Sequence, residues 1–348
     1  MKASDTPLNI PPITGHIVPA PDEPLEPAAS TAPPRAAEWT TDAGLLALVT
    51  IWGVNFTVIK FALEELHPLS FNALRFPVAS LVVYLILRSR GALRIPERRH
   101  WPALVALGLL GNTLYQLFFI FGIDGTGAGN AALLLATTPV WTILLATLLG
   151  HERGSTFVWI GAMGTVAGMA LVIAGGGEGF SADARTMRGD LLMVGSSMVW
   201  ASYSVGTRNL IRTYGSLQVT AWTLWAGTVG IVLFGVPSLA AAGLSGVSGG
   251  AWAGVLYAGA LAVGLAYSLW NRGIGRLGSA RTSVYSNLVP VVALVAAWLW
   301  LSEVPAPMQI TGALVILGSL FLARFGGRRP RPPGAEAPGT RTGEALRP

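Results

Sequence analysis

The chain has 348 residues, of which 52% are hydrophobic and only 11% are charged, and its mean hydropathy is +0.56. Soluble domains carry about 25% charged residues, so this composition excludes an ordinary soluble enzyme and predicts an integral membrane protein. Cysteine is absent, which excludes disulfides, thiolate metal sites and cysteine nucleophiles. The net charge of +6 is dispersed over loops and tails without interleaved aromatic residues. We therefore expect it to orient the chain in a membrane and not to bind nucleic acid.

The chain is predicted to begin and end with disordered tails. Residues 1–38 hold nine of the 23 prolines and no long apolar run, and residues 326–348 hold five more prolines. Between the tails lie ten apolar segments of about 18–22 residues, each long enough to cross a hydrocarbon core of about 30 Å as a helix. The predicted spans are 42–61, 69–87, 101–122, 127–149, 156–174, 189–208, 217–236, 251–271, 279–301 and 307–325.

The second half of the chain repeats the first. Residues 122–171 align with residues 273–322 at a constant offset of 151, and Trp52 falls on Trp200 at an offset of 148. Each repeat holds five predicted spans, and an odd number of spans places the second repeat upside down in the membrane. Inverted repeats of this kind are typical of transporters whose pathway lies between the two halves, although channels and some membrane enzymes also have them.

The predicted fold is therefore an all-α integral membrane protein with ten transmembrane helices in two inverted five-helix repeats. We place the first repeat at residues 39–175, the linker at 176–188 and the second repeat at 189–325, with the run Gly175-Gly176-Gly177 at the start of the linker region.

Arginine placement predicts that both termini are cytoplasmic, because cytoplasmic loops carry an excess of Lys and Arg. With the N-terminus inside, eleven arginines fall in inside loops and three basic residues fall at outside ends. The inside group is Arg88, Arg90, Arg94, Arg98, Arg99, Arg153, Arg208, Arg212, Arg272, Arg276 and Arg281. The outside group is Lys60, Arg185 and Arg188.

Several motifs occur at matching places in the two halves. The second repeat contains Asn287-Leu-Val-Pro-Val-Val-Ala-Leu, Leu301-Ser-Glu303 and Ile310-Thr-Gly-Ala-Leu-Val-Ile-Leu-Gly318. The first repeat has a looser copy in Thr138-Pro-Val-Trp, Glu152 and Ile160-Gly-Ala-Met-Gly164, and it opens with Trp52-Gly-Val-Asn-Phe56, Lys60 and Phe71-Asn-Ala-Leu-Arg-Phe76. In these motifs the chain resembles the EamA-type family of the drug/metabolite transporter superfamily.

The resemblance covers about residues 40–325 and implies a ten-helix metabolite carrier, usually an exporter of the bacterial inner membrane. Family members carry amino acids, amino-acid-like metabolites, nucleobases or drugs, so the substrate stays open. We interpret Glu152 and Glu303, which match the pattern at loop edges, as structural residues. No cofactor and no metal site is expected. The expected partners are a small-molecule substrate and the lipid bilayer, and the oligomeric state stays open, with a monomer compatible with the sequence.

Polar groups inside membrane-spanning helices are costly, so they tend to face a cavity or a partner helix. Asn112, Tyr115 and Gln116 fall on one face of the third span, and Trp200 and Tyr203 fall on one face of the sixth. We predict a central cavity with aromatic walls and a few neutral hydrogen-bonding groups, which suits a small amphipathic solute. The candidate cavity residues are Trp52, Asn55, Phe56, Asn112, Tyr115, Gln116, Trp200, Tyr203, Tyr267, Trp270 and Asn287. The alternative is that the polar groups only bond neighbouring helices.

Four further residues are singled out by position. Arg75 lies about six residues from the outer end of the second span, from which its side chain could snorkel, with Lys60 at the same level. This exit-side pair could hold a substrate carboxylate, or Arg75 could serve packing or topology. Pro139 and Pro290 are repeat-equivalent and fall near the middle of their spans, where proline kinks a helix. They are candidate hinges or static bends.

The sequence thus favours a carrier that exports amino acids or similar amphipathic metabolites by alternating access, mainly down their gradient. No Asp, Glu or His falls in the middle of a predicted span, which argues against an obligatory proton relay, although Asp190 lies at a span end. The alternative within the superfamily is a proton-coupled carrier of drugs, nucleobases or vitamins. A membrane enzyme acting on lipids is disfavoured, because no Asp-rich motif, paired His or Gly-x-Ser-x-Gly occurs in the spans. A receptor without transport activity is the third alternative.

Overall fold

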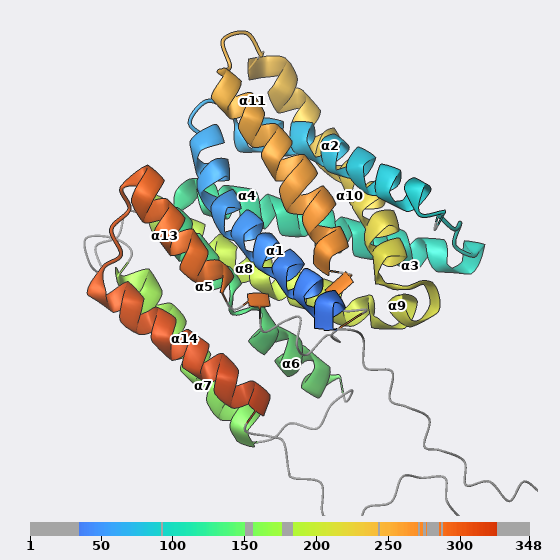
Figure 1. Ribbon diagram of the computed structural model, residues 1–348. Coiled ribbons are helices and arrows are strands. Elements are labelled where there is room, and N and C mark those ends of the chain that lie inside the picture. Colours follow the sequence, from blue (N-terminus) through green and yellow to red (C-terminus); the bar gives the residue numbers. More distant parts are fainter. Residues whose placement is uncertain are drawn as a thin grey trace, which may run out of the picture.

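The structure is a computed structural model that describes residues 35–91, 93–149, 156–175, 184–242, 244–270, 272–273, 276, 285–286 and 288–325. The described chain is helical and contains no strand, which confirms the predicted all-α class (Figure 1). The elements of the first half are α1 (Arg35–Ala62), α2 (Pro68–Ser89), η1 (Arg98–His100), α3 (Trp101–Gly108), η2 (Leu109–Leu114), α4 (Tyr115–Gly125), α5 (Ala128–Leu135), α6 (Thr138–Leu148) and α7 (Thr156–Gly175). Those of the second half are α8 (Ala184–Gly206), α9 (Arg208–Tyr214), α10 (Ser216–Ala242), α11 (Gly249–Leu256), η4 (Tyr257–Leu265), α13 (Val289–Leu301) and α14 (Pro307–Phe325).

Many of these helices are membrane-spanning in length and composition. In the described part, six stretches are long and apolar enough to cross a bilayer: Trp39–Ala62, Pro68–Ser89, Arg98–Gly125, Ala128–Leu148, Ser216–Ala242 and Gly249–Trp270. Trp159–Gly175, Val289–Leu301 and Pro307–Ser319 are shorter apolar helices. Large apolar side chains cover the outside of the bundle; Leu233, Leu314 and Trp300, for example, are 69%, 67% and 65% exposed. Exposure on this scale fits contact with lipid, and the chain is a multi-pass membrane protein.

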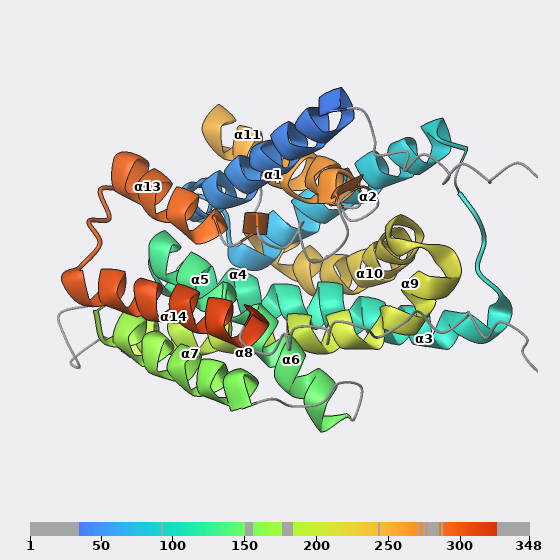
Figure 2. The same ribbon diagram turned by 60° about the horizontal axis from the view of Figure 1, so that its bottom comes forward.

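The two halves pack against each other in matching pairs. Helix α2 contacts α10, and α7 contacts α14, which are equivalent helices of the two halves; the last pair lies side by side in both views (Figures 1 and 2). The contact of α1 with α13 is matched by that of α8 with α6, and the contact of α2 with η4 is matched by that of α10 with η2. Ser80 and Thr228, which are 148 positions apart like Trp52 and Trp200, hydrogen-bond each other at 2.8 Å.

Two π-helical segments also match. Segment η2 begins at Leu109 and η4 begins at Tyr257, again 148 positions apart. π-Helical turns are rare and occur frequently at functional sites, because the wider turn re-aims the side chains that follow it. In the first half the following residues are Tyr115 and Gln116, which belong to the predicted cavity stripe.

Helix ends differ from the prediction at several places. Helix α1 begins at Arg35, inside the segment predicted as a tail, and α10 continues to Ala242, inside a predicted loop. The fourth predicted span is two helices, α5 and α6, separated at Ala136 and Thr137. Pro139 lies in the first turn of α6. Backbone N–H groups of a first turn have no partner within the helix, so the N–H that proline lacks costs no hydrogen bond there. The structure therefore has a helix break where the sequence predicts a kink in a continuous helix.

Pro290 occupies the same position in the first turn of α13. The predicted ninth span starts at 279, but α13 begins at Val289, and residues 277–284 lie outside the described residues. The equivalent placement of the two prolines is compatible with a hinge, but the hinge role stays a prediction. It would be tested by the transport rate of a Pro290→Ala variant.

Glycine permits a close backbone contact between the halves at the crossing of α7 and α14. A Cβ atom added to Gly312 would lie 2.7 Å from the carbonyl oxygen of Gly168 and 2.9 Å from the backbone nitrogen of Val172. These distances are too short for any side chain, so the two backbones touch through small residues, as membrane helices commonly do.

We predict that Gly312→Ala lowers the free energy of unfolding by about 1–3 kcal/mol, the usual cost of overpacking, because α7 and α14 must separate. Gly318→Ala in the same helix is the matched control, since a Cβ there meets nothing within 4 Å. Thermal unfolding of the purified variants in detergent would measure both. Equal melting temperatures for the two variants would contradict the close crossing.

Candidate functional site

The centre of the bundle holds a buried cation. Arg75 extends from the first half of α2 and is only 1% exposed. Its Nε donates to Oδ1 of Asn72 at 2.9 Å, and its Nη2 donates to Oε1 of Gln116 on α4 at 2.7 Å. The rings of Phe71 and Phe76 lie 5.0 and 5.4 Å from its Cζ. Amide oxygens and ring faces thus surround the guanidinium, and no carboxylate pairs with it among the described residues.

This position corrects one prediction. The sequence suggested that Arg75 snorkels toward the outer end of its span beside Lys60, whereas the structure turns its side chain into the protein. Lys60 has other partners: its Nζ donates to the carbonyl oxygens of Ile123 at 3.0 Å, Asp124 at 3.1 Å and Thr126 at 2.5 Å. These carbonyls end α4, where a cation is stabilised by the helix dipole. Lys60 and Arg75 therefore share no partner and do not form a pair.

A row of aromatic side chains passes next to Arg75. The ring of Tyr115 lies 4.8 Å from Trp200 and 5.7 Å from Phe119. Trp200 lies 5.0 Å from Tyr203, and Phe119 lies 5.8 Å from Phe56 of α1. Tyr115 is adjacent in sequence to Gln116, the residue bonded to Arg75. The row joins α1, α4 and α8, so it crosses between the two halves of the chain.

Two more residues complete this central group. The hydroxyl of Tyr203 is 2.9 Å from Oγ1 of Thr223 on α10. Tyr267, which follows η4, packs against a cluster of buried apolar side chains that includes Phe76 of α2 and Leu224 of α10. Because α2, α4, α8, α10 and the helix that follows η4 all contribute, the central group draws on both halves.

Trp52 and Trp270 form a second, separate pair. Their rings lie 5.6 Å apart, and Nε1 of Trp52 donates to the carbonyl oxygen of Ala262 in η4 at 2.8 Å. A π-helical segment leaves carbonyls available for such bonds. The repeat-equivalent tryptophans, Trp52 and Trp200, thus have different neighbours: Trp200 stacks in the central row, and Trp52 binds η4.

Two asparagines in the region have buried, unused polar atoms. Oδ1 of Asn55 and Nδ2 of Asn112 are buried and have no hydrogen-bond partner within the described part of the chain. A buried acceptor or donor without a partner lowers the folding stability by about 1–3 kcal/mol. These two atoms therefore favour a function in which a bound molecule supplies the missing hydrogen-bond partner. Asn287, the remaining candidate, lies outside the described residues.

The Lys60 end of the bundle contains a second polar network. Asp190 in the first part of α8 is 1% exposed, and its Oδ1 accepts a hydrogen bond from Thr126 at 2.6 Å. Glu303 accepts from the backbone nitrogens of Ala128 and Gly129, at 3.2 and 3.3 Å, and so binds the N-terminus of α5. This role agrees with the structural interpretation of Glu303. Glu152, its partner in the repeat, lies outside the described residues.

Sequence reasoning missed Asn72, Phe71 and Phe76, which hold Arg75, and Thr223, which bonds Tyr203. The first three lie on α2 within one turn of Arg75, so helical spacing around a lone intramembrane arginine is the signal that could have found them. Two cavities of the described residues, of about 480 and 380 Å³, are lined by other residues. In this conformation the central aromatic residues pack against one another.

Comparison with known proteins agrees with this architecture. The sequence pattern described as "EamA-like transporter family" matches residues 39–174 and again residues 187–325. The chain belongs to the EamA-like transporter family. The two matches divide it into duplicated halves, and as a family member the chain is a membrane transporter and not an enzyme.

Named relatives of this EamA-like transporter include exporters. A protein of Streptantibioticus cattleyicolor named "Probable terminal-alkyne amino-acid exporter" is 31% identical over 302 residues, which cover 85% of this chain and 97% of the relative. An Escherichia coli protein named "Probable amino-acid metabolite efflux pump" is 27% identical, covering 81% and 95%. A solved structure titled only "Crystal structure of protein" shares the fold, with a TM-score of 0.60, 21% identity and coverage of 82% and 96%.

We predict that Arg75 and Gln116 stabilise each other by about 1.5–3 kcal/mol, the range for a hydrogen bond to a charged group. The measurement is a double-mutant cycle of Arg75→Ala and Gln116→Ala in the unfolding free energy of the detergent-solubilised protein. A cycle of Arg75→Ala with Gln309→Ala is the control, because Gln309 bonds Asn130 and not Arg75. Coupling in the first cycle no larger than in the control would contradict the contact.

Proposed function

We propose that this transporter is a bacterial inner-membrane exporter of amino acids or similar small amphipathic metabolites. It works by alternating access between two inverted repeats of five spans each, at residues 39–175 and 189–325. The matching contacts of equivalent helices support the duplicated architecture, and the names of two relatives support the substrate class.

The single observation that carries the substrate class is Arg75. A buried cation needs a compensating anion or strong hydrogen bonds, and Arg75 has only neutral partners among the described residues. A carboxylate entering the centre would supply the missing anion through paired N–H donors. The aromatic row of Tyr115, Trp200 and Phe119 would contact an apolar side group, and the free acceptor of Asn55 would bind an ammonium group.

Packing of the row in this conformation fits an alternating-access cycle. The rings that touch each other here would separate when a solute enters, so that the same residues bind the solute or one another. The break between α5 and α6 at Pro139 and the start of α13 at Pro290 are the equivalent places where the halves would bend.

We expect Trp200 to be required for transport. Trp200→Ala removes the ring between Tyr115 and Tyr203, and we expect it to lower efflux of the transported amino acid from proteoliposomes by tenfold or more. The substrate is identified first by screening radiolabelled amino acids. Trp300→Ala is the matched control, because that ring is 65% exposed on the outside of α13 and should leave efflux near normal. Equal losses in the two variants would place the pathway elsewhere.

The same assay tests the energy source. We expect efflux to follow the substrate gradient without an imposed pH gradient, because the central group contains no carboxylate or histidine. Asp190 favours the alternative, since it is a buried carboxylate whose Oδ2 has no partner within the described residues. Uphill accumulation that a protonophore abolishes, and that Asp190→Asn loses, would replace the gradient-driven mechanism with proton coupling.

We expect both termini of the chain to lie on the cytoplasmic side of the membrane. The excess of arginines in alternate loops supports cytoplasmic termini. In this chain without cysteine, a single Cys at position 94 should resist an impermeant maleimide added to intact cells, and one at position 188 should react. Both side chains are exposed, so accessibility within the protein does not limit labelling. Labelling of position 94 alone would reverse the orientation.

A further inference from the structure

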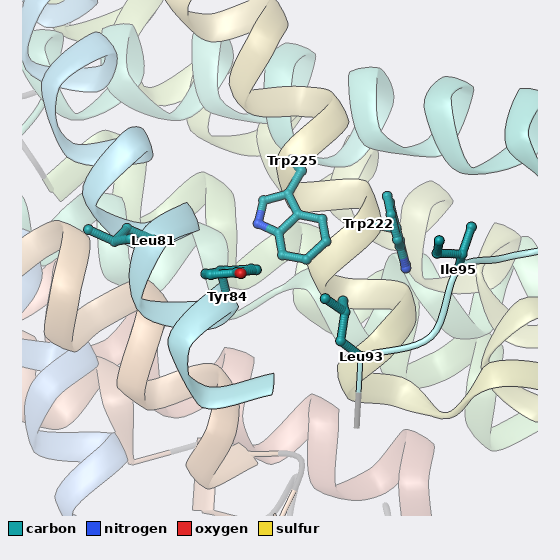
Figure 3. Close-up of a pocket in the computed structure, with 6 residues that line it drawn as sticks. All are labelled: Leu81, Tyr84, Leu93, Ile95, Trp222 and Trp225. Carbon is teal, nitrogen blue, oxygen red and sulfur yellow. The ribbon is translucent and has the colours of Figure 1, made fainter. Parts of the chain in front are cut away.

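A groove outside the transport centre lies where α2 ends. It has a volume of about 480 Å³ and is lined by Leu81 and Tyr84 of α2, Trp222 and Trp225 of α10, and Leu93 and Ile95 of the segment that connects α2 to η1 (Figure 3). The two tryptophans form one wall, the end of α2 forms another, and the connecting segment closes the third side (Figure 3). None of these residues contributes to the central group around Arg75.

Hydrogen bonds fix the tryptophan wall in place. Nε1 of Trp225 donates to the carbonyl oxygen of Ser80 at 3.2 Å, and Nε1 of Trp222 donates to that of Arg94 at 3.1 Å. The two rings lie 5.0 Å apart, and Trp222 also lies 5.1 Å from Trp101. Because both indole N–H groups are used, the ring surfaces left to the groove are apolar and rigid.

The lining is exposed although it is apolar. Ile95 is 80% exposed and Leu81 is 57% exposed. Leu81 lies on a membrane-spanning helix, but Ile95 lies in the connecting segment, among arginines. Exposed apolar side chains of this kind, next to the rings of Trp222 and Trp225, indicate a surface that another apolar molecule covers.

Positive charge surrounds the same place. Arg88 and Arg90 end α2, directly after the residues that line the groove, and Arg94 stands between Leu93 and Ile95. All three are exposed, and among the residues that the structure describes none of them forms an ion pair. Basic clusters at the end of a transmembrane helix attract anionic lipid headgroups, and each Lys or Arg adds about the same amount to the free energy of binding.

We propose that this groove binds an anionic phospholipid of the surrounding bilayer. One acyl chain lies against Trp222, Trp225 and Ile95, and the headgroup phosphate faces Arg90 and Arg94. The site requires only that the chain is embedded in a membrane, so it does not depend on the substrate or the direction of transport.

Such a lipid would join the two halves. Helix α2 belongs to the first half and α10 to the second, and they are already bonded through Ser80 and Thr228 close to the groove. A lipid seated across both helices adds contacts to this crossing. Bound lipid therefore stabilises the folded transporter.

The test compares lipids that differ only in headgroup charge. Purified transporter in detergent is titrated with phosphatidylglycerol or with phosphatidylcholine of the same acyl chains, and bound lipid is measured by native mass spectrometry together with the melting temperature. We expect phosphatidylglycerol to bind at least tenfold more tightly and to raise the melting temperature more than phosphatidylcholine does.

Amino-acid substitutions in the transporter test whether the phospholipid binds in the groove. Arg90→Gln with Arg94→Gln should weaken phosphatidylglycerol binding about thirtyfold, from the loss of two basic residues near a headgroup. Arg208→Gln with Arg212→Gln removes the same charge from α9 and should leave binding unchanged, since neither residue lines the groove. Ile95→Ser should weaken both lipids without unfolding the protein, because its side chain is largely exposed.

Three outcomes would overturn the proposal. The first is equal binding of the two lipids, which indicates only the general lipid shell. The second is an equal loss in the two arginine pairs, which indicates attraction by net charge. The third is a stable dimer without lipid that Ile95→Ser dissociates, which would assign the groove to a second copy of the chain.

Discussion

The central physical constraint on this protein is a fully buried arginine, Arg75, with which no carboxylate of the described chain forms an ion pair. A charge inside a membrane-spanning bundle is costly unless the surrounding groups replace its hydration. Arg75 meets this requirement through the amides of Asn72 and Gln116 and the rings of Phe71 and Phe76. These contacts fix the position of α4 against α2, and α4 in turn carries Tyr115 and Phe119 into the aromatic row.

The duplicated architecture places this arrangement between the halves. Equivalent helices meet at α2 with α10 and at α7 with α14, where Gly168 and Gly312 allow the backbones to touch. The π-helical segments η2 and η4 occur at equivalent positions, but their neighbours differ, since η2 leads into the stripe of Tyr115 and η4 accepts the hydrogen bond of Trp52. Duplication therefore gives the two halves the same arrangement of helices. Residues that differ at equivalent positions make the centre asymmetric: Arg75 of the first half, for example, is equivalent to Thr223 of the second half.

Much of the fold follows from the sequence, because hydrophobic length and the repeat offset are strong signals. Helical phase was also informative for the site: it put Tyr115 and Gln116 on one face of one helix and Trp200 and Tyr203 on one face of another. The structure brings these residues together. The direction of a single side chain was harder to predict. The depth of Arg75 along its span suggested snorkelling, but depth does not show whether a side chain points to lipid or to protein.

Other features leave little trace in one sequence. Neither η2 nor η4 contains a proline, and η2 contains Asn112 and Thr113 whereas η4 has no amide or hydroxyl side chain apart from Tyr257. The two segments therefore share no polar signal, because a π-helical turn needs only one extra residue within an apolar run. Proline predicted a bend at Pro139, but it does not distinguish a kink from the break that separates α5 from α6. The groove at the end of α2 depends on Trp222 and Trp225 meeting a segment more than 120 positions away, which helical periodicity within one span does not predict.

We propose that Arg75 receives the carboxylate of the transported solute. The most direct measurement is the thermal stabilisation of the purified transporter by L-amino acids, each compared with the amine that lacks its carboxylate, in the wild type and in Arg75→Gln. We expect that one or more amino acids raise the melting temperature, that the matching amines do so at least tenfold more weakly, and that Arg75→Gln removes this difference. Stabilisation by amines as strong as by amino acids, or a preference for the acids that survives in Arg75→Gln, would contradict it.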